Sequence, residues 1–310
     1  MHTNPLGKTQ LKVSTLGFGG APIAYLETEQ DRISHVLALL LDHGVNLIDT
    51  AACYQASEES IGRAVAHRRS EYILVSKCGH QVDQTQGAEF SAQLVNQTVD
   101  RALRRLRTDY LDVMLLHSCT LKTLQQGDAL ESLVKARDQG KIRFAGYSGD
   151  NEAVTYAAGL PEVSVVQTSV SICDQANIDQ GVAKAGKTNV GVIAKRPIAN
   201  AAWKDLSDQP GMYANYAKTY TDRLQQMGVT PSEFGFEGEP SEQWPEMALR
   251  FTLSIPGVHT AIIGTTNPNH VVANIAAAQK GPLPDEAVAR LRLAFEAAQR
   301  RVAESWTGQT

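Results

Sequence analysis

The sequence lacks the features that mark secreted, membrane-spanning or nucleic-acid-binding proteins. No run approaches the roughly 18 consecutive apolar residues that a membrane span requires. The opening residues, MHTNPLGKTQ, contain no apolar segment of the kind found in signal peptides. A formal net charge of -4 gives no reason to expect a nucleic-acid partner. We therefore expect a cytoplasmic protein that binds neither nucleic acid nor membrane.

Cysteine is scarce, and its four positions are scattered. Cys53, Cys78, Cys119 and Cys173 are too few for a disulfide framework and lack the paired spacing of a metal site. We expect reduced thiols and no bound metal. Strand alternation predicts that Cys53 and Cys78 point away from the polar residues beside them, as small packing residues. A redox-sensitive site at Cys53, Cys78 or Cys119 is the alternative.

No linker rich in proline, glycine or serine divides the 310 residues, which favours a single domain over residues 1–310. Apolar runs of strand length alternate with longer segments of helical periodicity, a pattern typical of parallel sheets. Eight consecutive strands of this kind predict a closed (β/α)8 barrel. The predicted strands reach, in chain order, Gly20, Asp49, Lys77, His117, Ser148, Gln167, Lys195 and Thr265.

Segments outside the predicted strands have helical or hairpin patterns. Residues 27–44 carry an apolar stripe at helical spacing, and Gly44 stops it. The alternation in QLKVS near the N-terminus predicts a small hairpin that caps one barrel end. Residues 267–279 and 284–306 are predicted to form two closing helices.

Ionisable side chains stand at three consecutive predicted strand ends. Asp49, Lys77 and His117 each end an apolar run, and Tyr54 follows the first of them closely. Each alone has a structural explanation: Asp49 could cap the next segment, Lys77 could extend its ammonium into water, and His117 could hydrogen-bond a loop carbonyl. Together they favour an active site, because the carboxyl ends of barrel strands form one mouth.

This combination of side chains suits proton transfer to a carbonyl oxygen. We expect Lys77 to lower the pKa of Tyr54 towards the working range, Asp49 to pair with Lys77, and His117 to donate to a substrate oxygen. Tyr54 would then act as a general acid. Because no side chain can supply hydride, a nicotinamide cofactor is required beside these residues.

The sequence resembles the aldo-keto reductase family over nearly its whole length. The resemblance rests on GVNLIDTAACY with SEESIG, ALRRLRTDYLDVMLLH, GKIRFAGYS, GVIAKRP and IIGTTNPNHVVANI. It implies a single (β/α)8 barrel with an N-terminal hairpin cap, C-terminal closing helices and an NAD(P)H-dependent reductase or alcohol dehydrogenase activity. The family's four catalytic positions match Asp49, Tyr54, Lys77 and His117, with Tyr54 as proton donor.

The resemblance also implies a set of cofactor-binding residues. Ser148 and Gln167 match a pair that binds the nicotinamide carboxamide, and Gly149 stands where many relatives have Asn, a contact that Asp150 or Asn151 could replace. Lys195 or Arg196 takes the place of a stacking Tyr, and a guanidinium suits stacking or pyrophosphate binding. Further positions on the cofactor side are Gly20, Ala21, Asp49 and Ile198.

The segment after the eighth strand resembles the family's adenosine-binding loop and helix. It supplies Gly264, Thr265, Thr266, Asn267, His270 and Asn274, with a helix N-terminus that favours an anion. His270 stands where many relatives carry Arg for the 2'-phosphate of NADP, and Gly264 stands where some carry Lys. We expect NADP(H), with NAD(H) as a serious rival.

The expected partner is a small-molecule carbonyl or alcohol, bound by a monomer or a small homo-oligomer. Its pocket would draw on Tyr25, Tyr54, His117 and Trp203, on the loop 78–90 and on the segment 200–243. Two other classes remain open. One is a non-catalytic, nicotinamide-binding regulatory subunit, and the other is a barrel isomerase or lyase that uses no nicotinamide.

Overall fold

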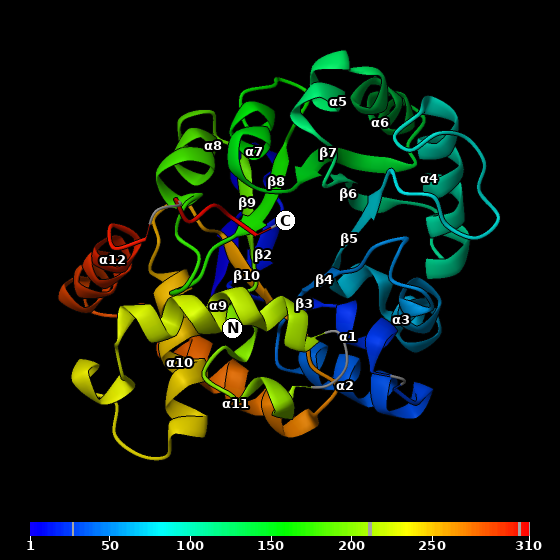
Figure 1. Cartoon of the computed structure of the whole chain (residues 1–310). Coiled ribbons are helices and arrows are strands. Elements are labelled where there is room, and N and C mark those ends of the chain that lie inside the picture. Colours follow the sequence, from blue (N-terminus) through cyan, green and yellow to red (C-terminus); the bar gives the residue numbers. More distant parts are fainter. Residues whose placement is uncertain (27, 210–212, 303–304, 310) are drawn as a thin grey trace.

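The computed structural model describes residues 1–26, 28–209, 213–302 and 305–309. Eight parallel strands close into a barrel in the order β10, β3, β4, β5, β6, β7, β8, β9 (Figure 1). The predicted barrel is therefore confirmed. Its strands are β3 (Leu16–Gly19), β4 (Leu47–Asp49), β5 (Ile73–Cys78), β6 (Leu111–His117), β7 (Ile142–Ser148), β8 (Val165–Ser169), β9 (Gly191–Lys195) and β10 (Thr260–Ile263).

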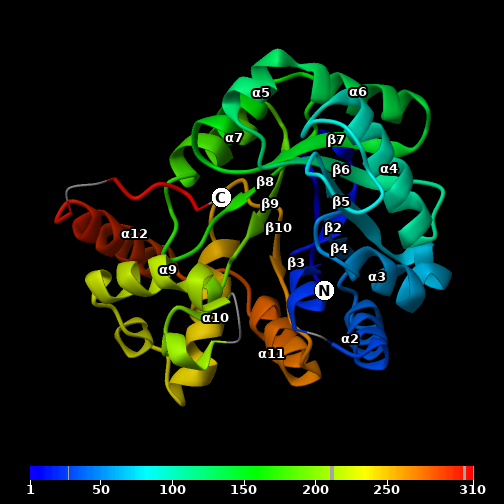
Figure 2. The ribbon, with the colours of Figure 1, turned by 45° about the vertical axis from the view of Figure 1, so that its right-hand side comes forward.

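Helices surround the barrel on its outer side in both views (Figures 1 and 2). The connection after β8 includes a π-helical turn, η3 (Ile178–Val182), that leads into α8. The helices are α1 (Ala21–Tyr25), α2 (Gln30–Asp42), α3 (Ser57–Val65), α4 (Ala92–Leu106), α5 (Leu121–Gln126), α6 (Asp128–Asp138), α7 (Asn151–Ala157), α8 (Ala183–Lys187), α9 (Tyr213–Met227), α10 (Pro240–Leu253), α11 (Pro268–Gln279) and α12 (Asp285–Gln299).

Helix α2 shows why these segments are helical and dock on the barrel. Its buried side chains recur every three or four residues, so they form one stripe against the strands. Gly44, at φ +76°, ends the helical segment in the left-handed region that glycine adopts freely. Residue 27, which the predicted helix includes, lies outside the described residues. The buried stripe is the predicted one: Ile33, Val36, Leu37, Leu40 and Leu41.

The predicted hairpin is present and fills the N-terminal end of the barrel. Strands β1 (Thr3–Pro5) and β2 (Lys12–Ser14) pair antiparallel. Ser14 and Asn46 exchange two hydrogen bonds, 2.7 and 2.9 Å long, which tie the hairpin to the start of β4. Three buried hairpin side chains join the apolar interior of the barrel: Leu6, Leu11 and Val13.

The interior of the barrel changes from apolar to polar along the strands. Alternate residues of a strand share one face, so the inward row of each strand continues every second residue. The lower inward positions form an apolar cluster that includes Leu47, Ile73, Val75, Val113, Leu115, Val165, Ile193 and Ile262. Two residues further along the same rows come the polar side chains Asp49, Lys77, His117, Gln167 and Lys195.

The last predicted helix is shorter than the sequence indicates. The sequence predicts a helix over residues 284–306, but α12 ends at Gln299. The chain then turns, and the ring of Trp306 packs edge-on against Phe295, with 5.0 Å between ring centroids. Trp306 thus packs back against α12, and the residues after it reach the ends of β8 and β9. Residues 303 and 304 lie outside the described part of the chain.

The described helices include none that is both long enough and apolar enough to cross a membrane.

The contact between α3 and α4 depends on a glycine. A Cβ atom at Gly62 would overlap the backbone carbonyl oxygen of Arg105 and lie 2.9 Å from the carbonyl carbon of Leu106. We expect Gly62→Ala to lower the free energy of unfolding by about 1–3 kcal/mol, because backbone atoms cannot easily move aside. Urea denaturation measures this change.

The matched control is Gly186→Ala in α8, where an added Cβ meets nothing within 4 Å. Alanine favours a helix over glycine by up to about 1 kcal/mol, so this variant should keep or raise stability. Equal stability of the two variants would contradict the proposed overlap.

Candidate active site

A buried ion pair lies at the centre of the barrel mouth. Lys77, on β5, donates from Nζ to Asp49 Oδ2 at 2.6 Å and to the backbone oxygen of Thr50 at 2.9 Å. The Lys77 and Asp49 side chains are only 1–2% exposed. Burial raises the pKa of Asp49, and the Lys77 ammonium opposes that shift. The pair joins two neighbouring strands and cancels most of the charge that each group would bring into the interior.

A chain of hydrogen bonds extends the ion pair across the mouth. Gln167, on β8, donates from Nε2 to the other Asp49 oxygen, Oδ1, at 2.8 Å. Ser148, on β7, donates from Oγ to Gln167 Oε1 at 3.1 Å. The structure thus brings together two predicted cofactor residues and two predicted catalytic residues. The shared partners fix the orientation of both amide and carboxylate groups.

Tyr54 stands beside the ion pair, but its pKa differs from the expectation. Lys77 Nζ lies 5.1 Å from the centroid of the Tyr54 ring, and its hydrogen bonds go to Asp49 and Thr50. Burial, followed by the Asp49 carboxylate, raises the pKa of Tyr54 well above 10. The predicted lowering by Lys77 is therefore wrong, because burial and the Asp49 carboxylate raise this pKa instead. Tyr54 keeps its proton at neutral pH.

His117 completes the predicted cluster as a neutral imidazole. Its ring stands edge-on to Tyr54, with 5.9 Å between centroids. Burial, then the nearby Lys77, His80 and Lys195, lower the pKa of His117 well below 6.5. A neutral imidazole has one N–H donor and one acceptor nitrogen. Tyr54 and His117 can therefore offer two hydrogen-bond donors to one acceptor oxygen without carrying charge.

The prediction that Cys53 points away from the cluster is wrong. Its Sγ lies 3.4 Å from His117 Nδ1. The reason is local geometry: β4 ends at Asp49, so Cys53 belongs to the turn before α3 and strand alternation does not apply to it. Cys78 and Cys119 are buried within the apolar core, as packing predicts. Burial raises the pKa of Cys53 and raises that of Cys119 to about 12.

Two further aromatic side chains border the cluster. The Tyr25 ring, in α1, lies 6.0 Å from the Tyr54 ring, centroid to centroid. The His80 ring lies 5.4 Å from His117 and 5.2 Å from Phe90. These contacts place α1 and the loop 78–90 beside the cluster.

Trp203 occupies a different environment. Its ring stacks on Trp244 of α10, with 5.7 Å between centroids and 5° between planes. Its part in substrate binding stays a prediction. Residues 210–212, within the predicted substrate segment 200–243, lie outside the described residues.

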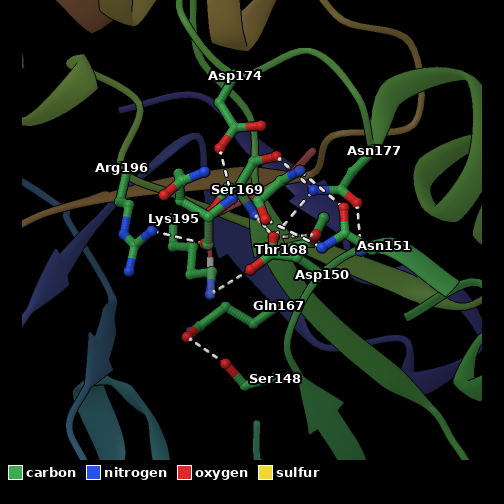
Figure 3. A network of polar contacts seen from close by, with 12 residues as sticks. Ser148, Asp150, Asn151, Gln167, Thr168, Ser169, Asp174, Asn177, Lys195 and Arg196 are labelled. Atoms are coloured by element: carbon green, nitrogen blue, oxygen red, sulfur yellow. Dashed lines mark hydrogen bonds and ion pairs between the residues drawn. The ribbon is translucent and has the colours of Figure 1, made fainter. Parts of the chain in front are cut away.

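The end of β9 carries two cations with different partners (Figure 3). Lys195 pairs with the buried carboxylate of Asp150 at 2.8 Å. Burial acts to raise the pKa of Asp150, but Lys195 and hydrogen bonds from Ser169 and Thr168 outweigh it and hold that pKa below its usual value. Arg196 donates from Nη1 to the backbone oxygen of Gln309 at 2.6 Å. Asp150 is therefore occupied by Lys195 and by hydrogen-bond donors from β8, whereas Arg196 binds the backbone of Gln309.

The segment after β10 forms a helix N-terminus with close backbone packing. Asn267 caps α11 by accepting from the backbone N–H of Asn269 at 3.0 Å. A Cβ at Gly264 would lie 2.5 Å from Pro22 Cδ and 2.7 Å from the Gly19 oxygen, so only glycine fits there. The predicted residues Thr265 and Thr266 lie between Gly264 and this cap. Such an N-terminus suits a phosphate.

Other predicted cofactor residues lie on either side of this segment. Gly20 donates its backbone N–H to the backbone carbonyl oxygen of Asp49 at 2.7 Å, and Ala21 begins α1 next to it. Asn274 is buried in α11, and Ile198 packs against the core. His270 Nδ1 lies 3.4 Å from Thr265 Oγ1. Burial, followed by the charge of Lys204, lowers the pKa of His270, so it is neutral at pH 7.

Several polar residues at the mouth have no signal in the sequence. Asp174, Asn177 and Arg223 are buried, and they contact Asp150 or the backbone of the last residues of the chain. The chain segment 306–309 returns to the ends of β8 and β9 after α12. Pairings across such distances along the chain follow no local period, which is why sequence patterns missed them.

Comparison with known proteins places these features in a family. A model of the aldo/keto reductase family matches residues 15–295. L-galactose dehydrogenase of Arabidopsis thaliana is 27% identical over 288 residues, covering 88% of this chain and 86% of the relative. Aldo-keto reductase AKR11C1 from Bacillus halodurans, solved in a holo form, has a TM-score of 0.79 and 26% identity. That alignment covers 95% of this chain and 96% of the relative.

The family match extends over most of the chain and over all eight barrel strands. Members of this family are oxidoreductases that use NAD(P)H and act on small molecules. The chain belongs to the aldo/keto reductase family.

Proposed function

We propose that this protein reduces an aldehyde or ketone to an alcohol, or catalyses the reverse, with Tyr54 as the proton donor. The observation that carries the proposal is the protonated Tyr54 beside the neutral His117 and the buried Lys77–Asp49 pair. A bound nicotinamide would supply the hydride. Two neutral donors suit an oxygen that gains negative charge as hydride reaches its carbon.

The residues at the mouth fit a dinucleotide. Ser148 and Gln167 offer a hydroxyl and an amide side by side, the set that a carboxamide needs. Arg196 presents a guanidinium at the end of β9, and the N-terminus of α11 presents backbone N–H groups. Gly264 keeps the backbone beside β3 free of side chain. The relative from Bacillus halodurans was solved in both a holo and an apo form, which supports a cofactor site in this barrel.

Each catalytic residue has a separate task in this proposal. Tyr54 donates the proton from its phenol, and His117 orients the carbonyl oxygen through its N–H. Lys77 stabilises the phenolate that remains after proton transfer, because its ammonium lies over the Tyr54 ring. Asp49 holds Lys77 in place and compensates its charge. The preference between carbonyl reduction and alcohol oxidation depends on the substrate and the cofactor.

We expect Tyr54→Phe to lower kcat at least about a hundredfold, because a positioned general acid contributes roughly two to four powers of ten. Cofactor affinity should change less than about twofold, since the hydroxyl acts mainly in the transition state. The measurement is oxidation of NADPH and NADH against a panel of simple aldehydes, with a fluorescence titration of each cofactor.

The control for this assay is Tyr156→Phe in α7, where the tyrosine is exposed on a helix outside the barrel. Full activity of Tyr54→Phe would remove Tyr54 from the proton-donor role. Tight cofactor binding without turnover in the wild type would instead support a non-catalytic, nicotinamide-binding regulatory subunit.

We propose NADP(H) as the preferred cofactor, with NAD(H) as the alternative. The N-terminus of α11 and the charge of Lys204 near His270 favour an additional phosphate. The neutral His270 adds no charge of its own. The difference in affinity between the two cofactors should therefore be modest in the wild type.

Replacing His270 with Arg should increase the preference for NADPH over NADH by about tenfold, because a charge-assisted hydrogen bond to the 2'-phosphate is worth roughly 1.5 kcal/mol or more. The ratio of the two dissociation constants measures this effect. The control is His67→Arg, an exposed site in the turn before β5. An unchanged ratio for His270→Arg would show that the 2'-phosphate does not lie at this helix.

A further inference from the structure

The last described residues of the chain form a tail at the barrel mouth. The tail, Trp306–Gln309, follows α12, and both ribbon views place the C-terminal end beside β8 (Figures 1 and 2). Ser169 at the end of β8 donates from Oγ to the Gln309 oxygen at 3.0 Å. Arg196 at the end of β9 donates to the same oxygen at 2.6 Å. The tail therefore contacts two neighbouring strands on their carboxyl side.

Polar side chains from several segments bind the backbone of the tail. Gly308 exchanges two hydrogen bonds with the Asn151 amide, at 2.7 and 3.0 Å. The Gln309 N–H donates to Asp174 Oδ2 at 3.0 Å, and Arg223 Nη2 donates to the Thr307 oxygen at 2.8 Å. Asp174 is fully buried and Arg223 is 4% exposed. Without the tail these groups would lose partners inside the protein, at a substantial cost in free energy.

Side-chain packing holds the start of the tail. The Trp306 ring contacts Phe295, and the Arg223 guanidinium lies 5.3 Å from a Trp306 ring centroid. Arg223 therefore contacts both the Trp306 ring and the backbone of Thr307. The number and burial of these anchors favour a tail that is a fixed part of the mouth over one that opens for each ligand.

The tail provides one of the contacts that hold the Arg196 guanidinium. Its backbone has φ +58°, a left-handed conformation that is costly for a residue with a side chain. Its neighbour Lys195 is already paired with Asp150. Arg196 has five N–H donors, and the bond to Gln309 uses Nη1, so other donors remain for a ligand. Its guanidinium carbon lies 5.7 Å from the Tyr216 ring centroid, which borders it on another side.

We propose that the tail Trp306–Gln309 is a positioning element for the cofactor, in which the Gln309 carbonyl holds the Arg196 guanidinium towards the bound pyrophosphate or nicotinamide. This proposal rests on the proposed nicotinamide-dependent function. It assigns Asn151, Asp174 and Arg223 the task of anchoring the tail. A segment outside the barrel strands thereby completes the cofactor side of the mouth.

Gly308 offers a way to displace the tail without touching Arg196. A Cβ there would overlap Asn177 Nδ2 and lie 3.0 Å from Asp150 Cβ. Asn177 cannot easily yield, because Nδ2 donates to Asp150 Oδ1 at 2.9 Å and to the Ser169 oxygen at 3.3 Å. Gly308→Val should therefore expel the tail. The matched control is Gly186→Val in α8, where an added Cβ has no atom within 4 Å.

The test is a double-mutant cycle on cofactor affinity, with Gly308→Val, Arg196→Ala and the combined variant. Dissociation constants for NADPH and NADH are measured by fluorescence titration, and thermal unfolding confirms that each variant is folded. Hydrogen exchange of the Gly308→Val protein without cofactor reports whether the Gln309 amide has lost its protection. If Gly308→Val does not fold, truncation before Trp306 replaces it.

We expect Arg196→Ala to weaken binding about tenfold and Gly308→Val to weaken it by a similar factor, with Gly186→Val at the wild-type value. The combined variant should bind no more weakly than Arg196→Ala alone, because both changes remove the same contact. If the tail only stabilised the fold, the two losses in cofactor affinity would multiply in the combined variant.

Two results would overturn the positioning role while leaving the proposed function intact. One is unchanged or tighter binding by Gly308→Val when exchange shows a released tail, which would make the tail an obstacle or a bystander. The other is a combined loss equal to the product of the single losses. Failure of the wild type to bind either cofactor would reject the proposed function itself, and the positioning role with it.

Discussion

A closed barrel allows the side chains of each strand only two directions, inward or outward, and this constraint determines the site. Because the inward rows repeat every second residue, the apolar positions Val113 and Leu115 are followed on the same row by His117. The same step leads from Ile73 and Val75 to Lys77. An apolar interior below and a polar layer above are thus parts of one pattern, and closure of the ring brings eight such rows to one mouth.

Within that mouth the charged side chains and the neutral hydrogen-bond donors are different residues. Lys77 and Asp49 carry opposite charges and compensate each other inside the barrel. Tyr54 and His117 remain neutral because burial opposes their charged forms. The site can therefore present hydrogen-bond donors to a ligand without first removing a counter-ion. At the end of β9, by contrast, both residues are cations: Lys195 is paired with Asp150, and Arg196 donates to the backbone carbonyl of Gln309.

The sequence predicted the barrel and the positions of the cluster because both depend on local periods. Asp49, Lys77 and His117 could be aligned by counting residues along apolar runs. Other features depend on contacts between distant segments, which no period records. After α12 ends at Gln299, Trp306 folds back on Phe295. Burial and the Asp49 carboxylate together raise the pKa of Tyr54.

The pairing that closes the barrel has a consequence for how the chain folds. Strand β3, near the beginning of the chain, pairs with β10, near its end, and the hairpin β1–β2 fills the interior that this pairing encloses. The entropy of closing so large a loop opposes folding before these contacts form, and topologies of this kind fold slowly. During synthesis, the barrel cannot close until its last strand, β10, has been made. The apolar side chains of the unfinished interior stay accessible to water until then, and chaperones recognise such surfaces.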